Sequence, residues 1–145
     1  MRFVLAIALL FAVGCHRGPK LPDGDVLAAV NRPELHGKPS LVMFVTPTCS
    51  HCLATIPRAI EAAAASGAGL VAVFVAGQEE NAKGVIDHTH FPGEWMVDDG
   101  ALRRRYAIKS VPHILVVGPD GTARDAYIGE QETQTLKDAI AGARR

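Results

Sequence analysis

Two cysteines, Cys49 and Cys52, are separated by only two residues and closely follow an apolar run at residues 41–45. Such a run is typical of a buried strand, and the cysteine pair then falls where the strand gives way to a helix. At a helix start the first cysteine meets free backbone N–H groups and the positive end of the helix dipole, and both stabilise its thiolate. Because the thiolate is the nucleophile of disulfide exchange, this pair predicts a redox-active disulfide.

The same spacing also occurs in zinc sites and in inert disulfides. A tetrahedral structural zinc site needs four ligands, and the sequence has no second cysteine pair after Cys49 and Cys52. A ring closed by so few residues removes little chain entropy, so it would be a weak stabilising cross-link. We therefore favour the redox interpretation, with a metal site and an inert disulfide as the alternatives.

The N-terminus resembles an export signal. Residues 3–13 are continuously apolar, but the run is shorter than the about 20 residues that span a membrane, so we expect a signal peptide at residues 1–14. The segment ending at Cys15 resembles a bacterial lipobox, in which that cysteine carries lipid, although Ala12 stands where leucine is preferred. Ordinary secretion with an unmodified Cys15 is the alternative.

The sequence predicts one folded domain behind this leader. Residues 15–24 contain prolines and glycines without apolar periodicity, which predicts a tether that carries the lipidated cysteine. Residues 25–145 are long enough for one domain with a single core. Lipidation of Cys15 would leave an even number of cysteines, in an exported compartment where disulfides persist. The formal net charge of zero gives no argument for a nucleic-acid partner.

Strands and helices alternate along this domain. The apolar patterns predict a helix that starts at the cysteine motif and stops at residues 66–69. They also predict strands at residues 41–45, 70–76, 94–97, 113–117 and 123–128, and further helices at residues 26–30, 78–90, 100–106 and 130–143. This order predicts an α/β fold with a central mixed sheet of four or five strands, flanked by helices on both faces.

Four landmarks give the sequence a family resemblance. They are the entry segment at residues 35–44, the pair Cys49 and Cys52, a proline at position 57, and the segment 106–112 followed by a strand and the turn at residues 118–121. Together they resemble the thioredoxin fold and, within it, the TlpA/ResA-like thiol-disulfide oxidoreductases, over residues 25–143. The resemblance implies a protein-disulfide oxidoreductase that is monomeric and needs no cofactor beyond its own disulfide.

The resemblance also implies roles for individual residues. Cys49 would attack substrate disulfides, and Cys52 would be the buried thiol that resolves the mixed disulfide. Pro112 would be a cis-proline facing the disulfide, which exposes the main chain of Val111 for an extended substrate segment. Thr48 would lie on the same substrate-binding surface, where the family usually has tryptophan.

Ser50 and His51 would tune the redox couple. A histidine at this position can stabilise the Cys49 thiolate and make the disulfide more oxidising. The family resemblance favours a reductant, so the sequence leaves the direction of electron flow open. The family often has a polar or acidic group near Met43, and a methionine there cannot shuttle a proton.

A copper-handling protein is the alternative function. Thiolate-rich sites favour copper(I) or zinc, and Cys49, Cys52, His51 and His113 could provide such a site. His113 would lie near the disulfide if it points outward, and otherwise would be a half-exposed residue at the start of a strand. In the favoured interpretation no metal is expected.

The expected location is the bacterial cell envelope, with the domain held at the membrane by lipid on Cys15 and facing the periplasm or the cell exterior. The expected partners are proteins with thiols or disulfides and an electron-transfer partner, not nucleic acid. Arg103, Arg104 and Arg105 form a basic patch. We interpret the patch as a solvated surface that could steer an acidic partner.

Overall fold

The computed structural model describes residues 19–145. The predicted signal peptide at residues 1–14 and the predicted lipidation site Cys15 lie outside the described residues. The helices are α1 (Val26–Ala29), η1 (Pro33–Leu35), α2 (Ser50–Ser66), α3 (Glu79–Thr89), α4 (Ala101–Arg105) and α5 (Thr133–Gly142). The strands are β1 (Ser40–Val45), β2 (Gly69–Phe74), β3 (Glu94–Val97), β4 (His113–Val117) and β5 (Ala123–Ile128). None of the helices within residues 19–145 combines the length and apolar character needed to span a membrane.

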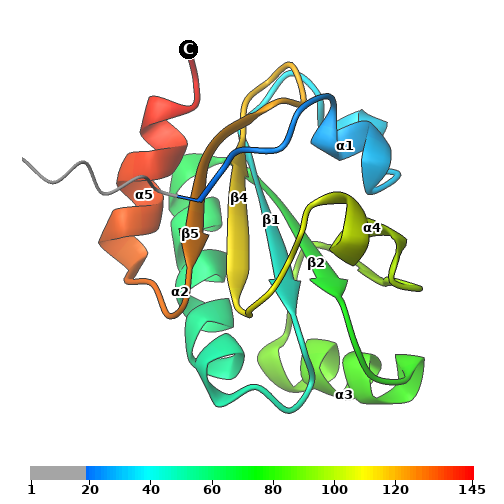
Figure 1. The fold of residues 1–145 in the computed structure, drawn as a ribbon. Coiled ribbons are helices and arrows are strands. Elements are labelled where there is room, and N and C mark those ends of the chain that lie inside the picture. The colour runs from blue at the N-terminus through cyan, green and yellow to red at the C-terminus, as the bar shows by residue number, and fades with distance from the viewer. Residues whose placement is uncertain (1–18) are drawn as a thin grey trace, which may run out of the picture.

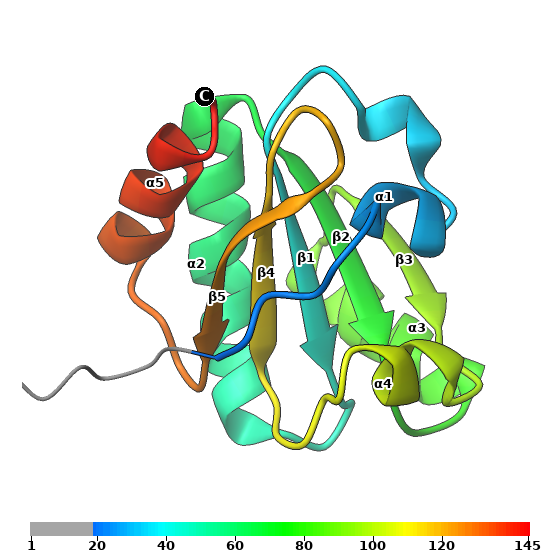
Figure 2. The same cartoon turned by 45° about the horizontal axis from the view of Figure 1, so that its top comes forward.

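The five strands form one mixed sheet in the order β3-β2-β1-β4-β5 (Figure 1; Figure 2 labels all five strands). Strand β1 pairs in parallel with β2, which pairs in parallel with β3. Strand β4 runs antiparallel to both β1 and β5. As a result, the end of β1 lies beside the start of β4, and the loops that follow β1 and precede β4 meet at one end of the sheet. The predicted mixed sheet is therefore confirmed, with five strands.

Helices cover both faces of the sheet (Figures 1 and 2). Side chains alternate between the two faces along a strand. In β1, Leu41, Met43 and Val45 face a core that includes buried residues of α2, α3 and α5. Val42 and Phe44 face a second core, which includes buried residues of α1 and α4. Because both faces are covered, β1 is apolar along its whole length, as its sequence indicated.

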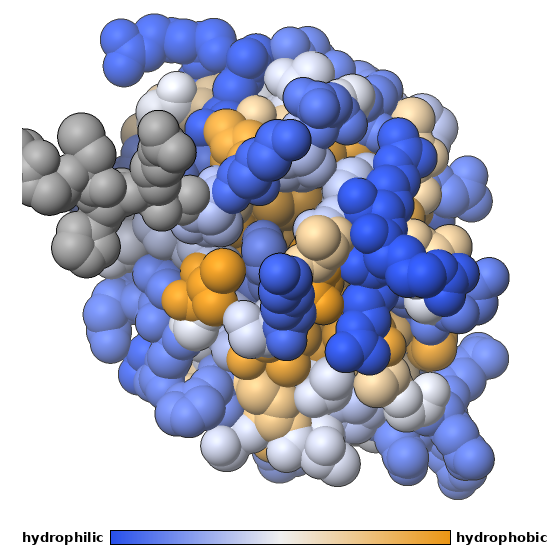
Figure 3. Space-filling view, viewed as in Figure 1, coloured by the Kyte–Doolittle hydropathy of each residue, from blue (hydrophilic) through white to orange (hydrophobic). Residues whose placement is uncertain are grey.

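The surface is mostly hydrophilic on the face that Figure 3 shows, with small hydrophobic areas between polar side chains. Among the described residues, the exposed large hydrophobic side chains are Leu53 and Ile128, with 37% and 50% of their surface exposed. Leu53 lies on the exposed side of α2, one residue after the buried Cys52.

The element boundaries differ from the expected ones mainly at the last helix. The sequence pattern predicts a helix from residue 130, whereas α5 begins at Thr133. The reason is a tertiary contact. The guanidinium of Arg58 on α2 binds the carboxylates of Glu130 and Glu132 and the carbonyl oxygen of Gln131. These contacts bind the segment before the helix, in which the N-cap Glu132 has an extended backbone.

The side chains of Asp25 and His36 interact at the end of the sheet opposite the cysteines. Asp25 is the N-cap of α1 and accepts a hydrogen bond from the Ala28 amide at 3.0 Å. His36 lies 2.8 Å from the other Asp25 oxygen and 2.6 Å from the Pro33 carbonyl. The Ala28 amide lowers the pKa of Asp25, and the Pro33 carbonyl, followed by Asp25, raises the pKa of His36.

Candidate active site

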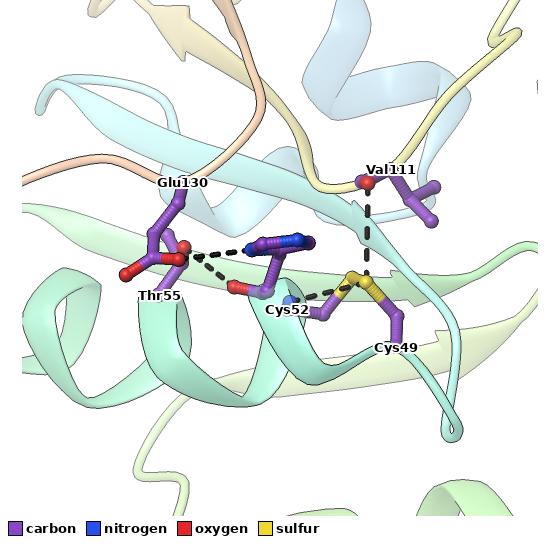
Figure 4. Close-up of a disulfide and its surroundings, with 6 residues drawn as sticks. Cys49, Cys52, Thr55, Val111 and Glu130 are labelled. Atoms are coloured by element: carbon purple, nitrogen blue, oxygen red, sulfur yellow. Dashed lines mark hydrogen bonds and ion pairs between the residues drawn. A yellow bond between two sulfur atoms is a disulfide. The ribbon is translucent and has the colours of Figure 1, made fainter.

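Cys49 and Cys52 form a disulfide at the end of the sheet where β1 ends and β4 begins (Figure 4). Cys49 follows the loop after β1 and is the N-cap of α2, while Cys52 lies in the first turn of that helix. Their Cα atoms are 5.2 Å apart, within the range that a disulfide bridges. The strand-to-helix position expected for the pair is thus confirmed.

The helix start supplies a donor to the Cys49 sulfur. The backbone N–H of Cys52 donates to Sγ of Cys49 at 3.1 Å. Cys49 therefore acts as an N-cap, because its side chain accepts a hydrogen bond from the amide three residues later. A thiolate at this atom would receive the same hydrogen bond together with the favourable end of the α2 dipole. Both interactions stabilise the anion more than the neutral thiol, so reduction of the disulfide would leave an activated Cys49.

The two sulfurs differ in accessibility. Cys49 is half-buried, whereas Cys52 is fully buried in the core beneath α2. Met43 is also fully buried in that core, as is the side chain of Thr55, whose hydroxyl donates to the His51 carbonyl. Cys49 is therefore the more accessible of the two cysteines.

The segment before β4 lies against the Cys49 sulfur (Figure 4). The peptide bond between Val111 and Pro112 is cis, as the family resemblance implies. The carbonyl oxygen of Val111 lies 3.8 Å from Sγ of Cys49, and Val111 is half-buried while Pro112 is buried. The antiparallel pairing of β1 with β4 brings this segment to the disulfide from more than sixty positions away in the sequence.

The predicted tuning residues lie on the exposed side of the motif. Thr48, Ser50 and His51 are all exposed. Nδ1 of His51 lies 3.0 Å from a carboxylate oxygen of Glu130, and Nη1 of Arg58 contacts the other oxygen at 2.9 Å. The hydrogen bond from His51 and the Arg58 charge lower the pKa of Glu130, so this carboxylate is ionised at neutral pH.

Sequence reasoning did not find Glu130 or Arg58. Glu130 is separated from His51 by 79 positions, and Arg58 lies 72 positions before Glu130. No local pattern connects residues at such distances. The only sequence signal was the position of residue 130 at the start of a predicted helix, which offers no partner for His51.

The expectations for His113 were wrong. Its side chain is buried rather than half-exposed, with 6% of its surface accessible. It packs edge-to-face on Phe44, with ring centroids 6.3 Å apart, and so lies on the sheet face opposite to Cys52. The described residues contain no group of three or more His, Cys, Asp or Glu side chains that could hold a metal ion. The structure therefore does not assemble the four-residue copper site.

His113 and His36 should make the stability of the fold depend on pH in opposite directions. Burial lowers the pKa of His113, so the unfolded chain binds more protons and acidification below about pH 6.5 should destabilise the fold. The pKa of His36 is raised, so its contribution is present below about pH 6.5 and is lost as pH rises through its folded-state pKa. The free energy of unfolding can be measured with denaturant from pH 5 to 8. In His113→Phe it should fall less on acidification, and in His36→Gln it should fall less as the pH rises. Unchanged pH profiles in both variants would contradict these assignments.

The fold matches solved structures over most of the chain. A secreted Mycobacterium tuberculosis disulfide oxidoreductase, homologous to E. coli DsbE, superposes with a TM-score of 0.68 over 75% of this chain and 84% of that one, at 24% identity. The chain has the thioredoxin fold. A thiol:disulfide interchange protein of the thioredoxin family from Chlorobium tepidum gives a TM-score of 0.69, at 20% identity, over 87% of this chain and 94% of its own. The fold resemblance seen in the sequence is thus confirmed, and these structural neighbours are thiol:disulfide oxidoreductases.

Curated sequences give a second comparison. The methylamine utilization protein MauD of Methylobacillus flagellatus is 31% identical over 99 residues, which are 68% of this chain and 47% of that protein. MauD of Methylophilus methylotrophus is 29% identical over a segment of the same length. The thioredoxin-fold chain spans about half the length of these relatives. No family model matches it.

Proposed function

We propose that this thioredoxin-fold protein is a thiol-disulfide oxidoreductase that exchanges disulfides with other proteins through Cys49 and Cys52. The observation that carries the proposal is the position of Cys49. Cys49 is half-buried, and its sulfur accepts a hydrogen bond from the helix start and lies against the Val111 carbonyl. The oxidoreductase neighbours of the same fold support this assignment.

In the reducing direction, the Cys49 thiolate attacks one sulfur of a substrate disulfide. A bond forms between Cys49 and that sulfur, and the other substrate sulfur leaves as a thiolate and takes up a proton. The Cys52 thiol then loses its proton and attacks Sγ of Cys49, which releases the second substrate thiol. The substrate gains two electrons and two protons, and the chain is left with the disulfide between Cys49 and Cys52.

The substrate segment would bind beside this sulfur. An extended chain next to the Val111 main chain could pair with it as an added strand, and Thr48 is exposed on the same surface. Regeneration requires a dithiol electron donor of lower potential, or, in the opposite direction, an acceptor that oxidises the pair. Sequential exchange with two partner proteins follows from this chemistry.

The proposal is tested by catalysed exchange. The protein should accelerate reduction of a protein disulfide by dithiothreitol, in proportion to its concentration, because Cys49 is activated relative to a free thiol. Prior alkylation of the reduced protein with iodoacetamide should remove the acceleration. Equal rates with and without the protein would contradict the proposed function.

We further propose that the protein acts in the bacterial cell envelope, anchored by lipid on Cys15. The supporting features are the apolar residues 3–13 and the lipobox-like segment that ends at Cys15. A lipid anchor would hold the domain near membrane-bound electron donors or acceptors.

His51 should make the couple more oxidising. An imidazole in the first turn of α2 favours the reduced state by stabilising the Cys49 thiolate. Replacing His51 with Gln removes this contribution, so the reduction potential should become more negative by roughly 30 mV, equivalent to about 1.4 kcal/mol. Equilibration in glutathione buffers gives the value.

Glu132→Gln provides a matched control for the His51 variant. Glu132 binds Arg58 at 3.2 Å, whereas the contact of His51 is with Glu130. The control should change the potential by less than about 10 mV. An unchanged potential in His51→Gln would rule out the tuning role.

A further inference from the structure

A small cavity lies between the loop after β1 and the segment before β4. Its volume is about 150 Å³. It is lined by Thr46, Val75, Ala76, Arg103, Ile108, Lys109, Ser110 and Val111. Two of these residues contact Cys49: the Thr46 carbonyl accepts from the Cys49 amide at 3.4 Å, and the Val111 carbonyl lies 3.8 Å from its sulfur. Cys49 itself is not part of the lining, so the cavity adjoins the disulfide through these two residues.

The walls combine apolar and cationic groups. Val75 and Ile108 are buried, and Val111 is half-buried, so they provide an apolar base. Arg103 and Lys109 are exposed and carry the only charges in the lining. The volume suits one side chain with an aliphatic stem and a charged end.

Neither cation is neutralised within the described part of the chain. No ion pair of residues 19–145 involves Arg103 or Lys109. Nε of Arg103 donates to the Ile108 carbonyl at 3.4 Å, which leaves the two Nη groups for another acceptor. A planar guanidinium with free Nη groups is suited to a carboxylate.

Two carboxylates lie outside this lining. Asp98 and Asp99 line an adjoining, larger cavity, which Arg103 and Lys109 also line. Asp98 is buried, and its two oxygens accept from the amides of Leu102 and Arg103 at 3.0 and 2.8 Å. One Asp99 oxygen accepts from the Ala101 amide. These hydrogen bonds leave the carboxylates charged, but the lining of the smaller cavity itself has two cations and no carboxylate.

We propose that this cavity receives an acidic side chain of the protein segment whose cysteine reacts with Cys49. The inference rests on the proposed function and names its substrate class: thiol or disulfide proteins with Glu or Asp near the reactive cysteine. The chain has no net charge, so attraction would come from this local pair of cations rather than from a general field.

Disulfide-linked peptides test the proposal. The series carries Glu, Gln or Lys two positions from the cysteine, on either side. At low salt, kcat/KM should be about 10-fold higher for the Glu peptide than for the Lys peptide of the better series, and the ratio should shrink at about 1 M salt. Equal values for all three peptides in both series would overturn the proposal.

Two charge-reversal variants locate the effect. Lys109→Glu should abolish or reverse the preference. Arg105→Glu changes the net charge equally, but Arg105 lies over the Tyr106 ring and lines a different cavity, so the preference should remain. If Arg105→Glu removed the preference as fully as Lys109→Glu, the cavity would not be its source. Absence of exchange with every peptide would instead contradict the proposed function.

Discussion

Replacing Cys49 with Ser should abolish disulfide exchange. The hydroxyl would occupy the position that accepts the Cys52 amide, but it is neither a thiolate nor able to form a disulfide. We expect the rate of protein-disulfide reduction to fall to that of the uncatalysed reaction, with little change in the free energy of unfolding of the reduced protein. Turnover assays and chemical denaturation under reducing conditions measure the two quantities.

Replacing Cys52 with Ser separates the two thiols. Cys49 would still attack, but the buried resolving thiol would be missing, so a mixed disulfide with the substrate should accumulate. Mass spectrometry after acid quenching should find the adduct on Cys49. Undiminished turnover in Cys49→Ser would contradict the assignment of Cys49 as nucleophile. So would a mixed disulfide that forms on Cys52 in the Cys49→Ser protein but not on Cys49 in the Cys52→Ser protein.

Truncating Phe44 to Ala should cause a large loss of stability. Phe44 has no exposed surface and packs edge-to-face on Tyr106 and His113, with centroid separations of 5.9 and 6.3 Å. The change leaves a cavity between the sheet and the helices α1 and α4. Such truncations cost about 3–5 kcal/mol, a large share of the about 5–15 kcal/mol that stabilises a domain.

Leu53→Ala is the control for Phe44→Ala. Leu53 is exposed on α2, so its truncation removes little packing and should cost less than about 0.5 kcal/mol. Urea unfolding of both variants provides the comparison. A loss below about 1 kcal/mol for Phe44→Ala would mean that the second core is looser than its burial indicates.

The sheet was predictable from the sequence because its strands are short and bounded by turns, and the central ones are apolar. Strands β3, β4 and β5 have the expected bounds, β1 begins one residue earlier, and β2 begins one residue earlier and ends two residues earlier. The start of α5 was not predictable, because residues 130–132 before it are bound by Arg58, which is far away in the sequence. Helix boundaries that depend on such tertiary contacts carry no local signal.

The candidate site was predictable only in its local part. The cysteine motif and the Val111-Pro112 segment could be found because each has its own sequence pattern. The orientation of His113 could not, since a residue at a strand start faces either side according to register, and β4 turns it onto Phe44. The Glu130 contact to His51 and the cavity beside Cys49 likewise arise from segments that only the fold brings together.

The reduction potential of the pair Cys49 and Cys52 tests the central proposal most directly. The protein is equilibrated in glutathione or dithiothreitol buffers, trapped with a thiol reagent and weighed by mass spectrometry. We predict a reversible two-electron transition between about −120 and −270 mV, the range of known disulfide-exchange proteins. A pair that stays oxidised below about −300 mV would be a structural disulfide, and the proposed exchange function would be wrong.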